Sequence, residues 1–291
     1  MSAPAASVIV ALNPHDAELR DVLDAYGAQT PGTPRFELLV VDNGSRAAAA
    51  KACAEARSRH AALDVRHVPC PRRGRAAANN TGAAEARSDV LVFVADDFVP
   101  SPPLVRAHVE FHRCTSNDAV AIGPAYFVPA LADDPFRHWL ERSGRLFGVP
   151  FASAALAWSR EFFYVGNASM KRTRFEALGG FDERFGHDLV DDLEFGYRLR
   201  DAGARTHLLT RAIAWHDHAV TLDERELAMR RAGAAARLVA QRWTGPLPWS
   251  GLVSLPLHEL GERVAQARQA TEAFFEARLD LAFAEGYAAA G

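Results

Sequence analysis

The sequence has little cysteine and no long apolar run. Its three cysteines, Cys53, Cys70 and Cys114, are widely spaced and form no C-x-x-C pair. This spacing argues against a disulfide framework and a zinc ribbon, and it favours a reducing compartment. No apolar run reaches the roughly 18 residues that a membrane-spanning helix needs. We therefore expect a cytoplasmic protein that is soluble or at most peripheral to a membrane.

An excess of charge of one sign is also missing, since 33 basic side chains stand against 36 acidic ones. This balance argues against a nucleic-acid-binding protein with a broad basic surface, so we expect a small-molecule partner. The first apolar segment, 7–12, is short and no basic residue precedes it, so we expect no signal peptide. Three prolines interrupt the apolar segment 245–257. Two interpretations of this segment remain, a packed loop and a membrane-surface contact.

Short β-branched runs alternate with amphipathic stretches through the first half of the chain. The predicted strands are 7–12, 36–41, 65–68 and 90–94, and the predicted helices run from about Leu19 to Tyr26, over 47–59 and over 75–86. Parallel strands need crossover connections of this kind. The order therefore predicts an α/β fold, with a mostly parallel sheet and helices on both faces.

The second half is less regular. Its predicted elements are a strand near 119–127 and helices over 189–202, 222–242 and 258–287. We expect a catalytic domain over 1–221, with a nucleotide-sugar-binding half (1–115) and an acceptor-binding half (116–221). The remaining residues, 222–291, would form a helical extension that acts as a cap or a homodimer surface.

Polar residues follow three of the predicted strands. Asn13 follows the first, Asp42 the second, and Asp96 and Asp97 the fourth. Ligands of open α/β sheets bind at the carboxyl ends of the strands, so these side chains predict a site there. Two carboxylates at a strand end suit a hard divalent cation, although a solvated turn would use the same residues.

Two further segments allow a structural and a functional interpretation each. Asp42 could make an Asx-turn with Gly44 or accept hydrogen bonds from a nucleotide, and the two roles are compatible. The basic residues Arg72, Arg73 and Arg75 precede a predicted helix, where guanidinium and free backbone N–H groups favour phosphate. A solvated basic turn is the alternative.

The later acidic and histidine residues complete the candidate site. Asp191 and Asp192 begin a predicted helix, where capping explains one of them and a general base explains the other. His216 and His218 follow a short apolar run, and alternation along a strand would let at most one of them reach a metal. The sequence does not decide which.

Taken in order, these segments resemble the family 2 glycosyltransferases of the GT-A fold. The resemblance covers about residues 7–220, and its strength lies in the order and spacing of the motifs. The segments that carry it are Ser7-Val-Ile-Val-Ala-Leu-Asn13, Val40-Val-Asp-Asn-Gly-Ser45, Gly74 to Gly82, Phe93-Val-Ala-Asp-Asp97, Val165-Gly-Asn-Ala-Ser169, Gly179-Gly-Phe-Asp-Glu-Arg-Phe185, Asp191-Asp192 and His216.

The resemblance implies a role for each of these positions. Asp192 would be the general base, with Asp191 as its neighbour in the acidic pair. Asp97 and His216 would hold Mg²⁺ or Mn²⁺. The donor, a nucleoside-diphosphate sugar and most often a UDP-sugar in this family, would bind through Asn13, Asp42, Arg75, Asn80 and Asp96. One in-line displacement would transfer the sugar with inversion to a hydroxyl of a glycan, a lipid-linked or a small-molecule acceptor.

This sequence departs from the family pattern at two places. Ala95 stands where the acidic motif often has an aspartate, and Asn79 stands where an arginine is common. Metal binding would therefore depend on Asp97, and phosphate contact on the basic residues 72–75. The membrane helices found in processive members are missing from this sequence, so we expect single-sugar transfer. A sugar nucleotidyltransferase, a metal-dependent hydrolase and a silent sugar-nucleotide-binding protein stay as alternatives.

Overall fold

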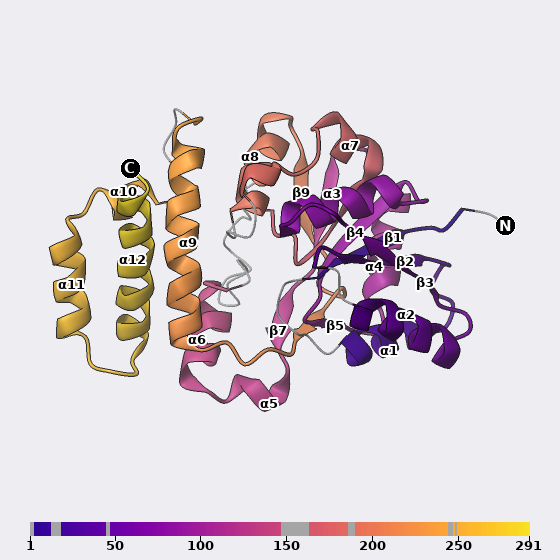
Figure 1. Cartoon of the computed structure of the whole chain (residues 1–291), viewed down its shortest axis with the longest axis horizontal. Helices are drawn as coiled ribbons and strands as arrows, with labels where there is room; N and C mark the ends of the chain where they lie inside the picture. Colours follow the sequence, from indigo (N-terminus) through magenta and orange to yellow (C-terminus); the bar gives the residue numbers. More distant parts are fainter. Residues whose placement is uncertain are drawn as a thin grey trace.

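The computed structural model describes residues 3–12, 19–44, 47–146, 163–185, 190–243, 247 and 249–291. In these ranges the chain forms two β-sheets with helices around them, and a group of helices lies at the end of the molecule away from the N-terminal strands (Figure 1). No helix among them is long and apolar enough to cross a membrane.

A seven-stranded sheet forms the centre, in the order β3-β2-β1-β4-β8-β6-β9. Its strands are β1 Ser7–Ala11, β2 Glu37–Asp42, β3 Asp64–Pro69, β4 Val90–Ala95, β6 Ala119–Ile122, β8 Asn167–Lys171 and β9 Arg205–Leu208. All pairings are parallel except those of β8, which runs antiparallel to β4 and β6. The prediction of a mostly parallel α/β sheet is confirmed.

Helices cover both faces of this sheet because its central strands β1, β2 and β4 are buried on both sides. Val8 and Val10 of β1 enter the core shared with α1 and α4, whereas Ile9 enters the core shared with α3 and α7. The helices of this part are α1 Leu19–Gly27, α2 Ala47–Arg59, α3 Arg75–Glu85, α4 Leu104–Arg113, α5 Pro129–Ala132, α6 Pro135–Ser143, α7 Arg172–Ala177 and α8 Asp191–Asp201, with a 3₁₀ turn at Glu183–Phe185.

A second, three-stranded sheet consists of β5 Phe98–Pro100, β10 Ala214–His216 and β7 Ala125–Phe127. The predicted single strand near 119–127 is therefore wrong. The chain leaves the large sheet after Ile122, where Gly123 donates its N–H to the carbonyl of Asn167 at 2.9 Å. Pro124 has no N–H to continue the ladder, and β7 then pairs with β10 in the small sheet.

The C-terminal region contains α9 Leu222–Ala240, α10 Ser250–Val253, α11 Leu257–Gln266 and α12 Glu272–Ala289. The predicted helix over 222–242 is confirmed. The predicted single helix over 258–287 is wrong, because the chain turns at Ala270, whose φ is 57°, and Thr271 starts α12 as its N-cap. Residue 222 also begins the predicted extension, whose status as a separate domain stays a prediction.

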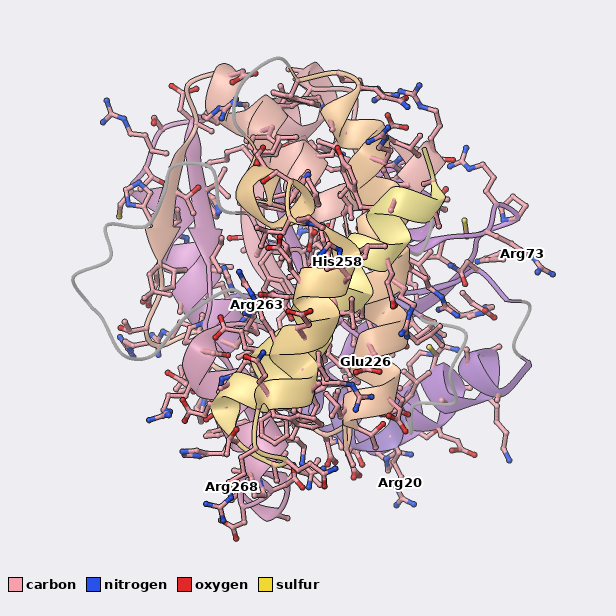
Figure 2. All side chains as sticks on the ribbon, turned by 90° about the vertical axis from the view of Figure 1, so that its left-hand side faces the viewer. Arg20, Arg73, Glu226, His258, Arg263 and Arg268 are labelled. Carbon is pink, nitrogen blue, oxygen red and sulfur yellow. The ribbon has the colours of Figure 1, made fainter. Side chains whose placement is uncertain are left out.

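Helices α9 and α12 pack closely through two glycines. A Cβ built on Gly233 would lie 2.0 Å from the carbonyl oxygen of Phe283, and one on Gly286 would lie 1.9 Å from that of Arg230. No side chain fits in either position, so the two backbones are in direct contact. Figure 2 looks onto this end of the molecule, where α11 and α12 lie in front of α9.

Candidate active site

Asp96 and Asp97 form the two-residue turn between β4 of the large sheet and β5 of the small one. The antiparallel pairing of β5 with β10 sets His216 opposite Phe98, next to this turn. His216 Nε2 consequently lies 2.9 Å from Asp97 Oδ2. Asp96 is buried, whereas the Asp97 side chain is 27% exposed, so Asp97 is the member of the pair that a ligand can reach.

The surroundings of Asp97 keep its carboxylate charged. Burial raises its pKa, but the hydrogen bond and charge of His216 outweigh burial and hold the pKa below its ordinary value. His218 is about half exposed, and its closest carboxylate is that of Glu224 at 4.0 Å. Of the two predicted histidines, His216 is therefore the one that the fold brings to Asp97.

The second acidic pair lies at the start of α8 and contacts α3. The guanidinium of Arg75, the first residue of α3, makes a two-pronged contact with Asp191, with Nε 3.2 Å from Oδ2. Arg75 Nη2 also lies 3.6 Å from Asp192 Oδ2. Arg75 thus serves as counter-ion to the acidic pair, which the sequence did not indicate, and its predicted contact with the donor stays a prediction.

Asp192 combines a backbone hydrogen bond with a raised pKa. It accepts a hydrogen bond from the N–H of Leu193 at 2.9 Å. Burial, assisted by the charge of Asp191, raises the pKa of Asp192 to about 6, although Arg75 acts in the opposite direction. A carboxylate that exchanges its proton near neutral pH suits a general base.

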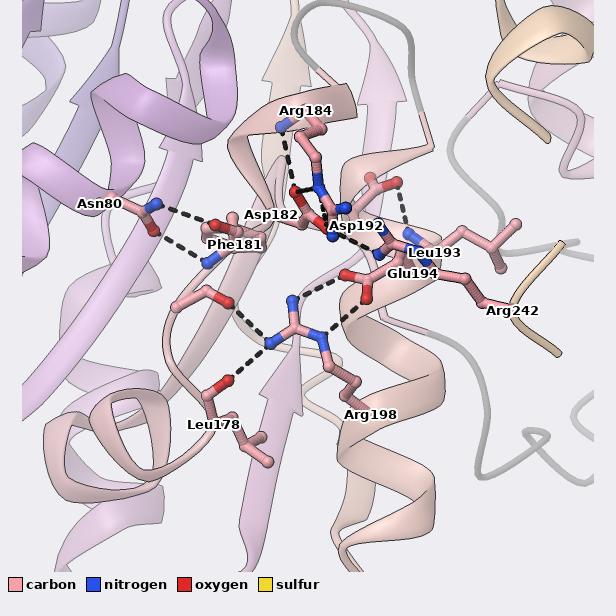
Figure 3. A network of polar contacts seen from close by, with 11 residues as sticks. Asn80, Leu178, Phe181, Asp182, Arg184, Asp192, Leu193, Glu194, Arg198 and Arg242 are labelled. Atoms are coloured by element: carbon pink, nitrogen blue, oxygen red, sulfur yellow. Dashed lines mark hydrogen bonds and ion pairs between the residues drawn. The ribbon is translucent and has the colours of Figure 1, made fainter. Parts of the chain in front are cut away.

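A network of polar contacts fixes the start of α8 (Figure 3). Arg198 of α8 pairs with Glu194 and donates to the carbonyls of Leu178 and Gly180 at 2.7 and 2.8 Å. The loop turns through positive φ at Gly180, where a Cβ would lie 2.6 Å from Asn80 Oδ1, so only glycine fits. Gly179 also has a positive φ, of 77°, so the backbone conformation favours glycine at both positions of the Gly-Gly-Phe motif.

Asn80 lies on the other side of this loop. Its amide donates to the carbonyl of Phe181 at 2.9 Å and to Glu183 at 3.0 Å, and its Oδ1 accepts from the N–H of Phe181 at 2.8 Å. These contacts join α3 to the loop before α8. They give Asn80 a positioning role, and its predicted contact with the donor stays a prediction.

The remaining sequence candidates are Asp42, Arg72, Arg73 and Asn13. Asp42 ends β2 and accepts from the N–H of Gly44 at 2.9 Å, as an Asx-turn requires, and it lies 3.3 Å from His67 Nε2. Arg72 pairs with Glu183 at 3.1 Å, and Arg73 projects outward (Figure 2). Asn13 lies outside the described residues.

Tyr164 is a site residue that the sequence did not reveal. The charges of both Asp97 and Asp192 reinforce the effect of burial in raising its pKa, so its ring lies near the two acidic sites. A Cβ on Gly166 would come within 2.3 Å of Tyr164 Oη, so the absence of a side chain at this glycine makes room for the tyrosine. Its only sequence signal was its place two residues before the Gly-Asn-Ala-Ser segment.

A buried polar cluster supports β8 behind the site. Ser169 Oγ lies 2.7 Å from His108 Nδ1 and 2.8 Å from His112 Nε2, and His108 Nε2 lies 3.1 Å from Asn167 Oδ1. Asn167 also donates to the carbonyl of Ala212, ahead of β10, at 2.7 Å. The cluster links α4, β8 and the approach to β10, so it helps to set the position of His216.

The residues around Asp97 fit a divalent cation that is also bound by substrate. Among the described residues no group of three or more His, Cys, Asp and Glu side chains is arranged to hold a metal. A magnesium-type ion commonly takes one or two protein ligands and completes its shell with phosphate oxygens and water. The pair of Asp97 and His216 matches that requirement, and a closed structural metal site does not.

The family model "Glycosyl transferase family 2" matches residues 7–179. The chain is 26% identical to the validoxylamine A glucosyltransferase of Streptomyces hygroscopicus subsp. limoneus, over 69% of this chain and 49% of that protein. It is 27% identical to the pre-mycofactocin glycosyltransferase of Mycobacterium tuberculosis, over 82% of this chain and 54% of that protein. It is 26% identical to the hyaluronan synthase of Pasteurella multocida, over 62% and 21%. The chain thus spans about half or less of these relatives.

Solved structures show the same fold. A mannosyltransferase from Pyrobaculum calidifontis in complex with GDP-Man and Mn²⁺ matches 99% of this chain and 74% of that one, with a TM-score of 0.56 and 19% identity. GalNAc-T7 with UDP, GalNAc and Mn²⁺ matches 95% and 54%, with a TM-score of 0.56 and 13% identity. The predicted GT-A fold is confirmed. Since the family model spans more than half of its length, the chain belongs to glycosyl transferase family 2.

Proposed function

We propose that the protein transfers a sugar from a nucleoside-diphosphate donor to an acceptor hydroxyl with inversion, and that Asp192 is the general base. The observation that carries the proposal is the contrast between two carboxylates near one tyrosine. Asp97 is held charged by His216, and Asp192 has a pKa of about 6. A fixed negative charge and a proton acceptor near neutral pH are what metal-assisted transfer requires.

In the proposed reaction the acceptor oxygen attacks the anomeric carbon of the donor sugar. At the same time the bond between this carbon and the diphosphate breaks. Asp192 takes the proton of the attacking hydroxyl, and the diphosphate departs with the bonding electrons. Attack from the face opposite the leaving group inverts the anomeric carbon. Arg75 and Asp191 hold the base in place through the contacts described above.

Donor binding is assigned to the ends of β2 and β4. The Asp42 carboxylate would bind the base or ribose, and Asp96 would bind ribose. Asp97 and His216 would hold Mg²⁺ or Mn²⁺, which would neutralise charge on the leaving diphosphate. Two structures of the same fold contain Mn²⁺ together with GDP-Man or with UDP, which supports this class of donor. A UDP-sugar is the first donor to test.

A thermal-shift screen of UDP-, GDP- and dTDP-sugars, with and without Mn²⁺, tests the proposal. We expect one nucleotide class to raise the melting temperature only when Mn²⁺ is present, and Asp97→Ala to abolish that increase. Asp89→Ala is the matched control, because Asp89 precedes the other end of β4 and is 83% exposed. A metal-independent increase, or one that survives Asp97→Ala, would disprove the metal role.

A further inference from the structure

A cavity of about 250 Å³ lies between the proposed base and the C-terminal helices. Arg75, Tyr164 and Asp192 line it on the side of the active site, and Met229 of α9 and Phe283 of α12 line it on the other. Its volume lies below the roughly 300–1,000 Å³ of pockets for drug-sized ligands, so it suits a small single or fused ring or a short alkyl segment and no chain of sugars. Most of the other lining residues are apolar.

Ion pairs and close helix packing form two walls of the cavity. Arg145, which follows α6 and lines the cavity, pairs with Glu276 and Asp280 of α12 at 2.7 Å each. The close packing of α9 on α12 at Gly233 and Gly286 fixes the opposite wall. The C-terminal helices are therefore attached to the catalytic part of the chain at the point where the cavity forms.

Two lining side chains have hydrogen-bond donors without a partner. Arg225 of α9 donates from Nη2 to the carbonyl of Arg145 at 2.5 Å, but its buried Nε has no partner, and no carboxylate pairs with it in the described part of the chain. Trp249 is 8% exposed, and its Nε1 also has no partner there. Burial lowers the pKa of Arg225 to about 10, so it is still a cation at neutral pH.

We propose that this cavity binds the acceptor, and that the acceptor has an apolar ring or alkyl body with an anionic group. The apolar body would contact Met229 and Phe283, Arg225 would pair with the anionic group, and Asp192 would meet the hydroxyl. Arg225 forms no ion pair with any described carboxylate, and such a guanidinium beside an apolar cavity is complementary to a carboxylate on an apolar body. This inference depends on the proposed role of Asp192 as base.

Binding of 2-naphthoate and 2-naphthamide, measured by their fluorescence, tests the inference. The two probes have the same shape, and only the first is charged. We expect saturable binding of 2-naphthoate, and Arg225→Gln should weaken it about ten- to hundredfold while 2-naphthamide binding stays unchanged. Ala232→Phe should abolish binding of both probes because the added ring fills the cavity, which Ala232 lines.

The matched control is Ala265→Phe, the same substitution at an exposed position of α11. If Ala232→Phe does not fold, Met229→Trp fills the same cavity from a half-buried position about one turn earlier. Equal probe binding to wild type and a filled variant, or no saturable binding, would overturn the inference. If Arg225→Gln weakens the binding of UDP or GDP and leaves the binding of 2-naphthoate unchanged, Arg225 belongs to the donor site. That result would also overturn the inference.

Donor binding separates this inference from the proposed function. All variants are tested with UDP, GDP and dTDP in the presence of Mn²⁺, and this binding needs Asp97 but not the cavity. If wild type binds none of these nucleotides, the proposed function fails. If nucleotide binding is intact in every variant and the probes do not distinguish them, only the acceptor inference fails.

Discussion

Two acidic sites near Tyr164 give their carboxylates opposite properties. Asp97 lies against His216, whose hydrogen bond and charge overcome the effect of burial and lower the pKa of the carboxyl. Asp192 lies beside Asp191, and burial raises its pKa to about 6 although Arg75 is near. The comparison shows that the balance between burial and neighbouring charges, and not the residue type, determines whether each carboxylate suits a cation or a proton.

The largest expected effect comes from Asp192→Asn. The amide cannot accept the proton of the acceptor hydroxyl, so kcat should fall by about 10²- to 10⁴-fold. Because burial already favours the neutral form of Asp192, a neutral amide should be tolerated by the fold. Steady-state transfer assays give kcat, and thermal shift with UDP or GDP and Mn²⁺ gives nucleotide binding.

Asp97→Asn is the matched variant at the other site. It should lose metal-dependent nucleotide binding, whereas Asp192→Asn should keep it. If both substitutions reduce nucleotide binding equally, the two carboxylates do not have separate roles and the comparison fails.

The second expected effect concerns stability in acid, which must be known before any pH profile is interpreted. Burial lowers the pKa of His108 to about 4 and that of His112 to about 3. The unfolded chain protonates histidine near 6.5, so between these values it binds more protons than the folded chain, and stability falls as the pH falls. At pH 5 each of the two histidines should lower the free energy of unfolding by about 2 kcal/mol relative to neutral pH.

Urea unfolding at pH 7 and pH 5 measures this loss. NMR of the histidine rings provides an independent measurement, with the exposed His258 as the reference in the same spectra. If the rings of His108 and His112 become protonated in the folded protein above pH 5, the explanation is wrong.

The regular parts of the fold could be predicted from the sequence because local patterns determine them. After Ser7, β1 is apolar, and β4 is apolar throughout, as strands covered on both faces must be, and the four large apolar side chains of α1 are all buried. The small sheet could not be predicted. Its strands β5 and β10 have three residues each, too few for a periodic pattern. The break between α11 and α12 at Ala270 has no glycine or proline to mark it.

In the candidate site, too, the residues that belong to local motifs could be predicted, and the contacts between distant segments could not. Asp97 and His216 come from motifs with a recognisable order, and the fold places them 2.9 Å apart. Tyr164 and Arg225 belong to no sequence motif. Their place in the candidate site is recognised only when β8, α8 and α9 are assembled in the folded chain. Arg75 belongs to a predicted basic segment, but its pairing with Asp191 joins residues 116 positions apart in the chain and was not predicted. Long-range charge pairing of this kind leaves no local pattern in a single sequence.

The smallest expected effect tests the cause of the raised pKa at Asp192. Rates of transfer should fall about tenfold for each pH unit below 6, because the base must be ionised. Asp191→Asn removes the neighbouring negative charge, so the pKa of Asp192 should decrease and this acid limb should move down by roughly one pH unit. The measurement is kcat/KM between pH 5 and 8. Asp182→Asn is the matched control, since Asp182 pairs with Arg184 and Arg242 in the adjacent network and should leave the limb near 6. A limb that stays near 6 in Asp191→Asn would mean that burial alone raises the pKa, and the acidic pair would then act on the base only through its geometry.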